Sequence, residues 1–178
     1  MHHYDDLIIL FNDCFAAEYN TRLIKGSDEP IYIPAHQTQS HNAVCFAHGF
    51  FSSALHECSH WFIAGSERRK LMDFGYWYAP DGRNQEQQEQ FQKVEVKPQA
   101  LEWILSIACN YPFRVSIDNL NGTSFDTEAF KQAIHQQVLI YCRDGLPGRA
   151  HKFRLALCEH YARPEVLCGE EFRLENLR

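Results

Sequence analysis

The sequence predicts one α+β domain, in which helices pack against a small mixed sheet. Short apolar runs bounded by prolines and glycines alternate with longer stretches that repeat at helical spacing. Hydrophobic residues make up 45% of the 178 residues, enough for one core at this length. No repeat, linker or low-complexity tract divides the chain. Residues 1–178 are therefore expected to form a single domain, with a loosely held tail at 165–178.

The first half of the chain is expected to contain two helices and two strands. Residues 3–16 carry apolar side chains at helical spacing, which predicts a helix. Residues 29–34 form a short apolar run between two prolines, and residues 43–48 form another that ends at a His-Gly turn. Both runs predict strands. The second helix is expected at 52–65, where apolar residues recur on one face.

The second half is expected to begin with an aromatic edge strand at 74–78, closed by a Pro-Asp-Gly turn. A glutamine-rich helix at 84–93 then leads to Pro98, which either kinks that helix or starts the next one over 101–107. The remaining expected elements are a strand at 113–117, a turn at 119–122, and helices at 126–143 and 149–162.

The helix expected at 52–65 contains the most informative pattern of the chain, H-E-x-x-H. His56 and His60 lie four residues apart, so both imidazoles point to nearly the same side of a helix and can reach one metal ion. Such a pair leaves coordination positions for a third protein ligand and for water or substrate. Glu57 can act as a base or orienting group. The competing interpretation is a chance match in a chain with ten histidines, against which the helical context argues.

The third metal ligand must come from elsewhere in the chain. Catalytic zinc sites and non-haem iron sites commonly combine two histidines with one carboxylate. Glu95 is the leading candidate because it is a lone acid between two valines. Glu102, within the apolar helix, is the second candidate. The competing interpretation of each is a helix-surface carboxylate, and it is favoured slightly for Glu102. His48, at the end of a strand that leads into the metal helix, is a further candidate ligand or donor, although such a histidine is more often structural.

Composition excludes several classes of function. A formal net charge of −6 argues against general nucleic-acid binding, which depends on clustered positive charge. Neither a signal peptide nor a run of about 18 apolar residues is apparent, so no membrane association is expected. The seven cysteines are scattered, without a C-x-x-C pair. They are expected to be reduced core thiols of a cytoplasmic protein.

Longer strings are more specific than H-E-x-x-H alone. They are Asn20–Gly26, Asp28–Tyr32, His48–Phe50, His56–Trp61, Asp73–Tyr78, Pro80–Arg83, Val94–Ala100, Tyr111–Phe113 and Asp118–Leu120. Together, over about residues 3 to 160, they resemble the elongation factor P hydroxylase family.

The resemblance implies an enzyme that hydroxylates a lysine side chain of elongation factor P after a β-lysyl group has been attached to it. It also implies a fold similar to that of a small bacterial metal-dependent endoribonuclease. The ligands carried onto this sequence would be His56, His60 and Glu95, with Fe(II) as the metal and O₂ as co-substrate. Glu57 would orient a ligand or move a proton. Hydroxylation needs two further electrons, whose donor the sequence does not name.

The substrate arm carries ammonium groups, so acidic and aromatic residues are expected to line its path to the metal. The nearest candidates are Asp73, Tyr76, Trp77, Tyr78 and Asp81. Each of them is equally well explained as a core aromatic residue or a turn aspartate.

Two other functional classes fit the same motif. A zinc-dependent hydrolase, either peptidase-like or ribonuclease-like, would use the same ligands, with Glu57 activating water. A binding module for a translation factor would hold a structural metal in a closed site. Metal content alone does not separate these classes, because such a site generally holds Zn²⁺ more tightly than Fe²⁺. A requirement for O₂ does separate them.

Overall fold

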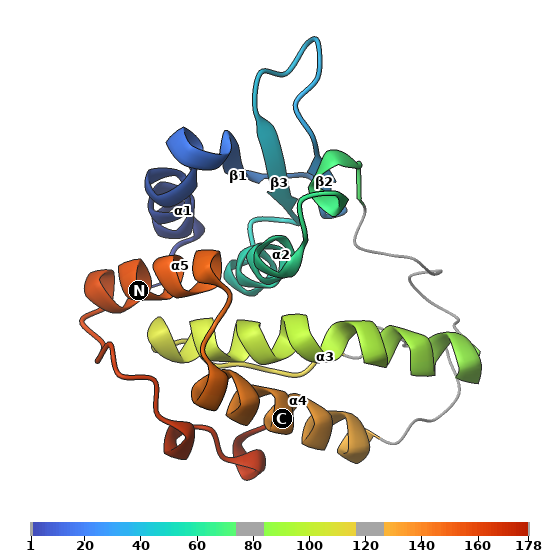
Figure 1. Ribbon diagram of the computed structural model, residues 1–178, viewed down its shortest axis with the longest axis vertical. Coiled ribbons are helices and arrows are strands. Elements are labelled where there is room, and N and C mark those ends of the chain that lie inside the picture. The colour runs from blue at the N-terminus through green and yellow to red at the C-terminus, as the bar shows by residue number, and fades with distance from the viewer. Residues whose placement is uncertain (1, 74–83, 117–126, 178) are drawn as a thin grey trace.

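The computed structural model describes residues 2–73, 84–116 and 127–177, drawn as coloured ribbon in Figure 1. Within these ranges the chain forms one domain with five α-helices and a three-stranded sheet. The predicted fold class, a single α+β domain with a small mixed sheet and packed helices, is confirmed.

The sheet is mixed, with the strand order β1-β3-β2. β1 (Thr21–Lys25) runs parallel to the central strand β3 (Asn42–Phe46). β2 (Ile31–Ile33) runs antiparallel to β3 on its other side. β2 and β3 correspond to the two strands predicted in this half of the chain.

β1 was not predicted, although its sequence carries the signal of a strand. Thr21 and Leu23 are buried, and Arg22 between them is exposed. This alternation is that of a strand with one covered face. The strand is only five residues long, and its charged residues mask the apolar ones.

α2 (Phe51–Ile63) is the central helix of the domain. Figure 1 shows it between the sheet and α3 (Gln85–Ala108), and it packs against both. A tight turn joins β3 directly to α2, with positive φ angles at His48 (54°) and Gly49 (72°). The H-E-x-x-H motif therefore lies on a helix that is fixed on two sides.

α3 is one continuous helix through Pro98, so Pro98 does not start a second helix. Asn84 and Gln87 form a capping box at its beginning. The proline removes one backbone hydrogen bond. Burial of the following apolar turns outweighs that loss. The residues buried there include Ala100, Leu101, Ile104 and Leu105.

The remaining helices complete a continuous core. α1 (Tyr4–Tyr19) packs on β1 and on α5 (Gly148–His160), and α4 (Thr127–Asp144) lies along α3 (Figure 1). These three helices were predicted close to their observed positions. No helix among the described residues has the length and hydropathy needed to cross a bilayer.

The strand predicted at 113–117 is wrong over 113–116, which is irregular. The backbone N–H and C=O of Ser116 bond to the side chain of Gln99 instead of to a neighbouring strand. The edge strand predicted at 74–78 and the turn predicted at 119–122 lie outside the described residues.

In the segment 165–178, which was predicted to be a loosely held tail, two of the described side chains pack into the core of the domain. Phe172 and Leu177 are buried at 2% and 5% exposure. The ring of Phe172 meets that of Trp103 at a centroid distance of 5.2 Å, and its carbonyl accepts a hydrogen bond from His135 Nε2 at 2.9 Å. Leu167 and Leu174 are partly buried against the same core, so a few spaced apolar side chains hold this segment.

Candidate metal centre

Two neighbouring helices bring three potential metal ligands together. On α2, the Nε2 atoms of His56 and His60 lie 3.1 Å apart. On α3, Glu95 is 3% exposed and turns its carboxylate toward them. Its Oε1 lies 3.1 Å from His60 Nε2, and its Oε2 lies 3.5 Å from His56 Nε2. The donor atoms all fall within 4.8 Å of one another, so one metal ion can contact all three residues.

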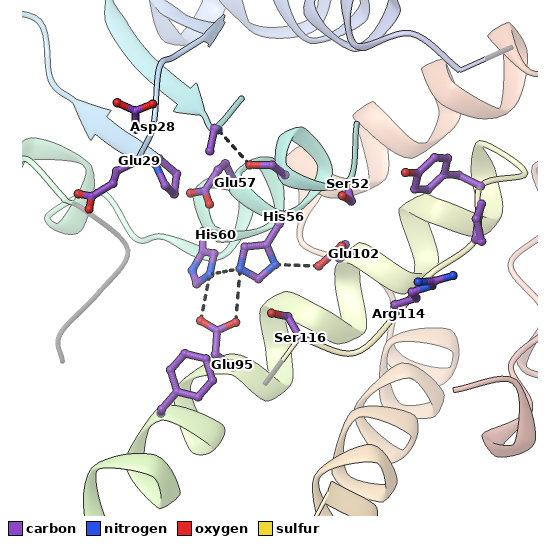
Figure 2. Close-up of a pocket in the computed structure, with 16 residues that line it drawn as sticks. Asp28, Glu29, Ser52, His56, Glu57, His60, Glu95, Glu102, Arg114 and Ser116 are labelled. Carbon is purple, nitrogen blue, oxygen red and sulfur yellow. Dashed lines mark hydrogen bonds and ion pairs between the residues drawn. The ribbon is translucent and has the colours of Figure 1, made fainter. Parts of the chain in front are cut away.

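Glu102, the second candidate for the third ligand, lies on the opposite side of the His56 ring. Its Oε2 is 2.7 Å from His56 Nδ1 (Figure 2). An ionised carboxylate only accepts hydrogen bonds, so Nδ1–H donates to Glu102 and Nε2 faces Glu95 and His60. Carboxylates that hold the distal nitrogen of a ligating histidine fix its tautomer and ring orientation. The geometry thus gives the two glutamates different roles.

The charges of this cluster are coupled. Burial by itself lowers the pKa of His56, but the neighbouring carboxylates of Glu102, Glu95 and Glu57 raise it to about 10. For Glu95 the effects are reversed. Burial raises the pKa of its carboxyl group, but the two histidines outweigh that effect and lower the pKa to about 2. In the metal-free protein, His56 is therefore protonated at neutral pH and Glu95 is ionised.

Metal binding is consequently expected to release protons. Because the pKa of His56 is raised to about 10, a metal ion that takes its Nε2 must displace a proton at every pH below that value. We expect release of at least one proton per Zn²⁺ at pH 7.5, and an affinity that rises about tenfold per pH unit. Titration calorimetry in buffers of different ionisation enthalpy measures this number. A heat independent of the buffer would contradict the prediction, and Glu102→Gln should release fewer protons.

The candidate ligands form the floor of a cavity of about 600 Å³. Its walls come from the β1–β2 loop, from α2 and α3, and from the segment at 111–116 (Figure 2). Its described lining residues include more carboxylates than cations, even with His56 protonated. The carboxylates are Asp28, Glu29, Glu57, Glu95 and Glu102, and the cations are Arg114 and His56. The negative charge of the cavity therefore favours a positively charged ligand.

Glu57, like His60, lines this cavity and also a second one of about 240 Å³. Burial raises the pKa of its carboxyl group; the histidines oppose that effect, and Glu95 and Glu102 add to it. A carboxyl group with a raised pKa holds its proton more readily than an ordinary glutamate, which suits a group that transfers protons. Glu57 is neither one of the three potential metal ligands nor part of the His56–Glu102 contact. Its carboxyl group is therefore left for another role beside the ligands.

The other residues predicted to serve the site are distributed differently. Asp73 lines the smaller cavity, where it accepts a hydrogen bond from Arg68 Nε at 2.7 Å. His48 is exposed and does not line the larger cavity, because the turn after β3 directs it outward. The substrate-contact candidates Tyr76, Trp77, Tyr78 and Asp81 lie outside the described residues.

The cavity-lining residues that site reasoning from the sequence missed include Asp28, Glu29, Tyr111 and Arg114. The acidic pair could have been noticed because it precedes a strand at a proline. No local sequence pattern marks Tyr111 and Arg114 as site residues. They line the cavity beside α2 only because the segment at 111–116 folds back after α3.

The fold and the site define a small α+β protein with a candidate two-histidine, one-carboxylate metal centre at the bottom of an acidic cavity. The model of the elongation factor P hydroxylase family matches residues 10–172. A Haemophilus influenzae protein described as elongation factor P lysine hydroxylase is 59% identical over 161 residues, which cover 90% of each chain. The chain belongs to the elongation factor P hydroxylase family, as the resemblance predicted, and the matched region includes all the residues of the candidate centre.

Proposed function

We propose that this protein hydroxylates the β-lysylated lysine side chain of elongation factor P, with Fe(II) as cofactor and O₂ as co-substrate. The observation that carries the proposal is the convergence of His56, His60 and Glu95 at the floor of an acidic cavity in a member of this family. Two imidazoles and one carboxylate suit Fe(II) and leave room for exchangeable ligands. When bound, iron would supply the activation of O₂ that side chains cannot provide.

The residues of the chain have separable tasks in this proposal. Glu102 holds Nδ1 of His56, so that Nε2 faces the metal position. Glu57 holds or moves a proton beside the reacting carbon. One oxygen atom enters the C–H bond and the other leaves as water, which consumes two protons and two electrons from an external donor.

The substrate arm bears ammonium groups, and the acidic wall supports its recognition. Asp28 and Glu29 lie on one side of the cavity and Arg114 lies on the other (Figure 2). A cationic arm would therefore approach with its charged end toward the β1–β2 loop and away from Arg114.

Neutralising this acidic pair is expected to weaken substrate binding. The double variant Asp28→Asn/Glu29→Gln should raise the KM for β-lysylated elongation factor P about three- to thirtyfold with little change in kcat, since each exposed charge pair contributes up to about 1 kcal/mol. Salt should shrink the difference. Asp13→Asn/Glu18→Gln, on exposed positions of α1, changes the net charge equally and should not alter KM. Equal KM values for both double variants would contradict the prediction.

The proposed function is tested by the intact mass of β-lysylated elongation factor P. The substrate is incubated in air and with ascorbate as reductant, with Fe(II)-loaded, Zn²⁺-loaded or metal-free protein. We expect a gain of one oxygen atom only with iron and only in air. An unchanged mass in every sample would overturn the proposal, and cleavage fragments in the zinc sample would indicate the alternative, a zinc-dependent hydrolase with Glu57 as the base.

A further inference from the structure

A buried polar stripe runs along α3 where this helix faces the metal-binding helix. Glu95, Gln99 and Glu102 follow one another at intervals of four and three residues, so they project from one side of α3. Their exposures are 3%, 0% and 7%. The two glutamates contact His56 from opposite sides of its ring. Gln99, between them, is the most deeply buried of the three.

The hydrogen bonds of Gln99 fix the orientation of its side-chain amide. Oε1 accepts from the backbone N–H of Ser116 at 3.0 Å, and Nε2 donates to the Ser116 carbonyl at 2.8 Å. A flipped amide would place oxygen against oxygen and N–H against N–H, so only one orientation satisfies both contacts. The second hydrogen of Nε2 is then directed to Oε2 of Glu95, at a distance of 3.5 Å.

We propose that Gln99 is a positioning residue that sets the direction of the Glu95 carboxylate for metal binding, an inference that rests on the function proposed above. Gln99 engages Oε2, while Oε1 lies 3.1 Å from Nε2 of His60. A buried carboxylate with one oxygen held by a neutral donor cannot rotate freely about its last torsion.

The same amide also joins the ligand to the cavity wall. Ser116 lines the larger cavity together with Pro112 and Arg114 on the segment that returns after α3. This segment is irregular, and the two hydrogen bonds from Gln99 tie its end to α3. The Gln99 side chain therefore contacts both the Glu95 carboxylate and the 111–116 segment of the cavity wall. A substitution of Gln99 is expected to affect both.

The test is the Zn²⁺ affinity of Gln99→Met, measured by chelator competition. Methionine keeps the unbranched shape and removes all three hydrogen bonds. We expect a 10- to 100-fold loss of affinity, as is typical when a partner of a metal ligand is removed. The matched control is Ser59→Ala, which removes a buried hydrogen bond to the Leu55 carbonyl within α2 and should bind Zn²⁺ like the wild type. An unchanged affinity of Gln99→Met would overturn the proposal.

A double-mutant cycle with Glu95→Gln separates positioning from general destabilisation. If Gln99 acts through the Glu95 carboxylate, Gln99→Met should cost little further affinity in the Glu95→Gln background. An equal loss in both backgrounds would overturn the proposal. If Gln99→Met does not fold, as judged by thermal unfolding, Gln99→Asn replaces it in the same cycle, since its amide is one methylene shorter. These affinities are independent of turnover, so an inactive wild type with a coupled cycle would overturn only the proposed function.

Discussion

Glu95→Gln is expected to abolish hydroxylation and to lower metal affinity by more than about 100-fold, beyond the 10- to 100-fold usual for an outer partner. The carboxylate is almost fully buried, and its two oxygens face the Nε2 atoms of the two histidines. An amide in its place keeps the shape but loses the negative charge that a divalent ion needs from this set. Zn²⁺ titration and the oxygen-transfer assay measure the two effects separately.

Glu102→Gln is the matched comparison, because it makes the same chemical change seven residues later on the same face of α3. Glu102 contacts only the distal nitrogen of His56 among the groups of the centre. Its variant should therefore keep a metal site, with an affinity reduced about 10- to 100-fold and partial activity. If Glu102→Gln lost the metal while Glu95→Gln retained it, the assignment of the third ligand would be reversed.

This pair shows where inference from the sequence ends. The spacing of His56 and His60 defines their common direction because both lie within one turn of one helix. Glu95 and Glu102 are seven residues apart, so helical periodicity places both on the same side of α3 and cannot choose between them. Which glutamate faces the Nε2 atoms depends on the position along α3 at which this helix packs against α2. That position is set by tertiary contacts. The His56 ring fits between the two carboxylates and so distinguishes them.

The fold shows the same division between local and tertiary information. Helices with long apolar faces, such as α1 and α4, were predictable from their periodicity. The segment at 113–116 alternates like a strand, but its end bonds to a glutamine side chain. The C-terminal segment was predicted to be loosely held because chain ends usually are, yet Phe172 and Leu177 are buried there. In these cases the contacting residues are distant in the sequence, so the local sequence pattern does not predict the contact.

Glu57→Gln is expected to separate catalysis from metal binding. Glu57 is beside His56 in the sequence but is not one of the three converging donors. Zn²⁺ affinity should therefore change only a few-fold. Hydroxylation should fall about 100- to 10,000-fold in kcat with a similar KM, the range for removal of a group that transfers a proton. Burial raises the pKa of Glu57, so this carboxyl group binds a proton more readily than an ordinary glutamate, whereas glutamine has no proton to exchange.

A control for the lost charge is Glu18→Gln, on the exposed face of α1, where Glu18 pairs with Lys152 at 3.1 Å. It should leave kcat unchanged, because an exposed pair far from the cavity contributes little. A Glu57→Gln protein with normal kcat would show that the proton comes from elsewhere and that this carboxyl only shapes the two cavities it lines. Loss of metal from the variant would instead mean that Glu57 stabilises the centre electrostatically. The predicted combination, bound metal with lost turnover, is the one that a proton-transfer role requires.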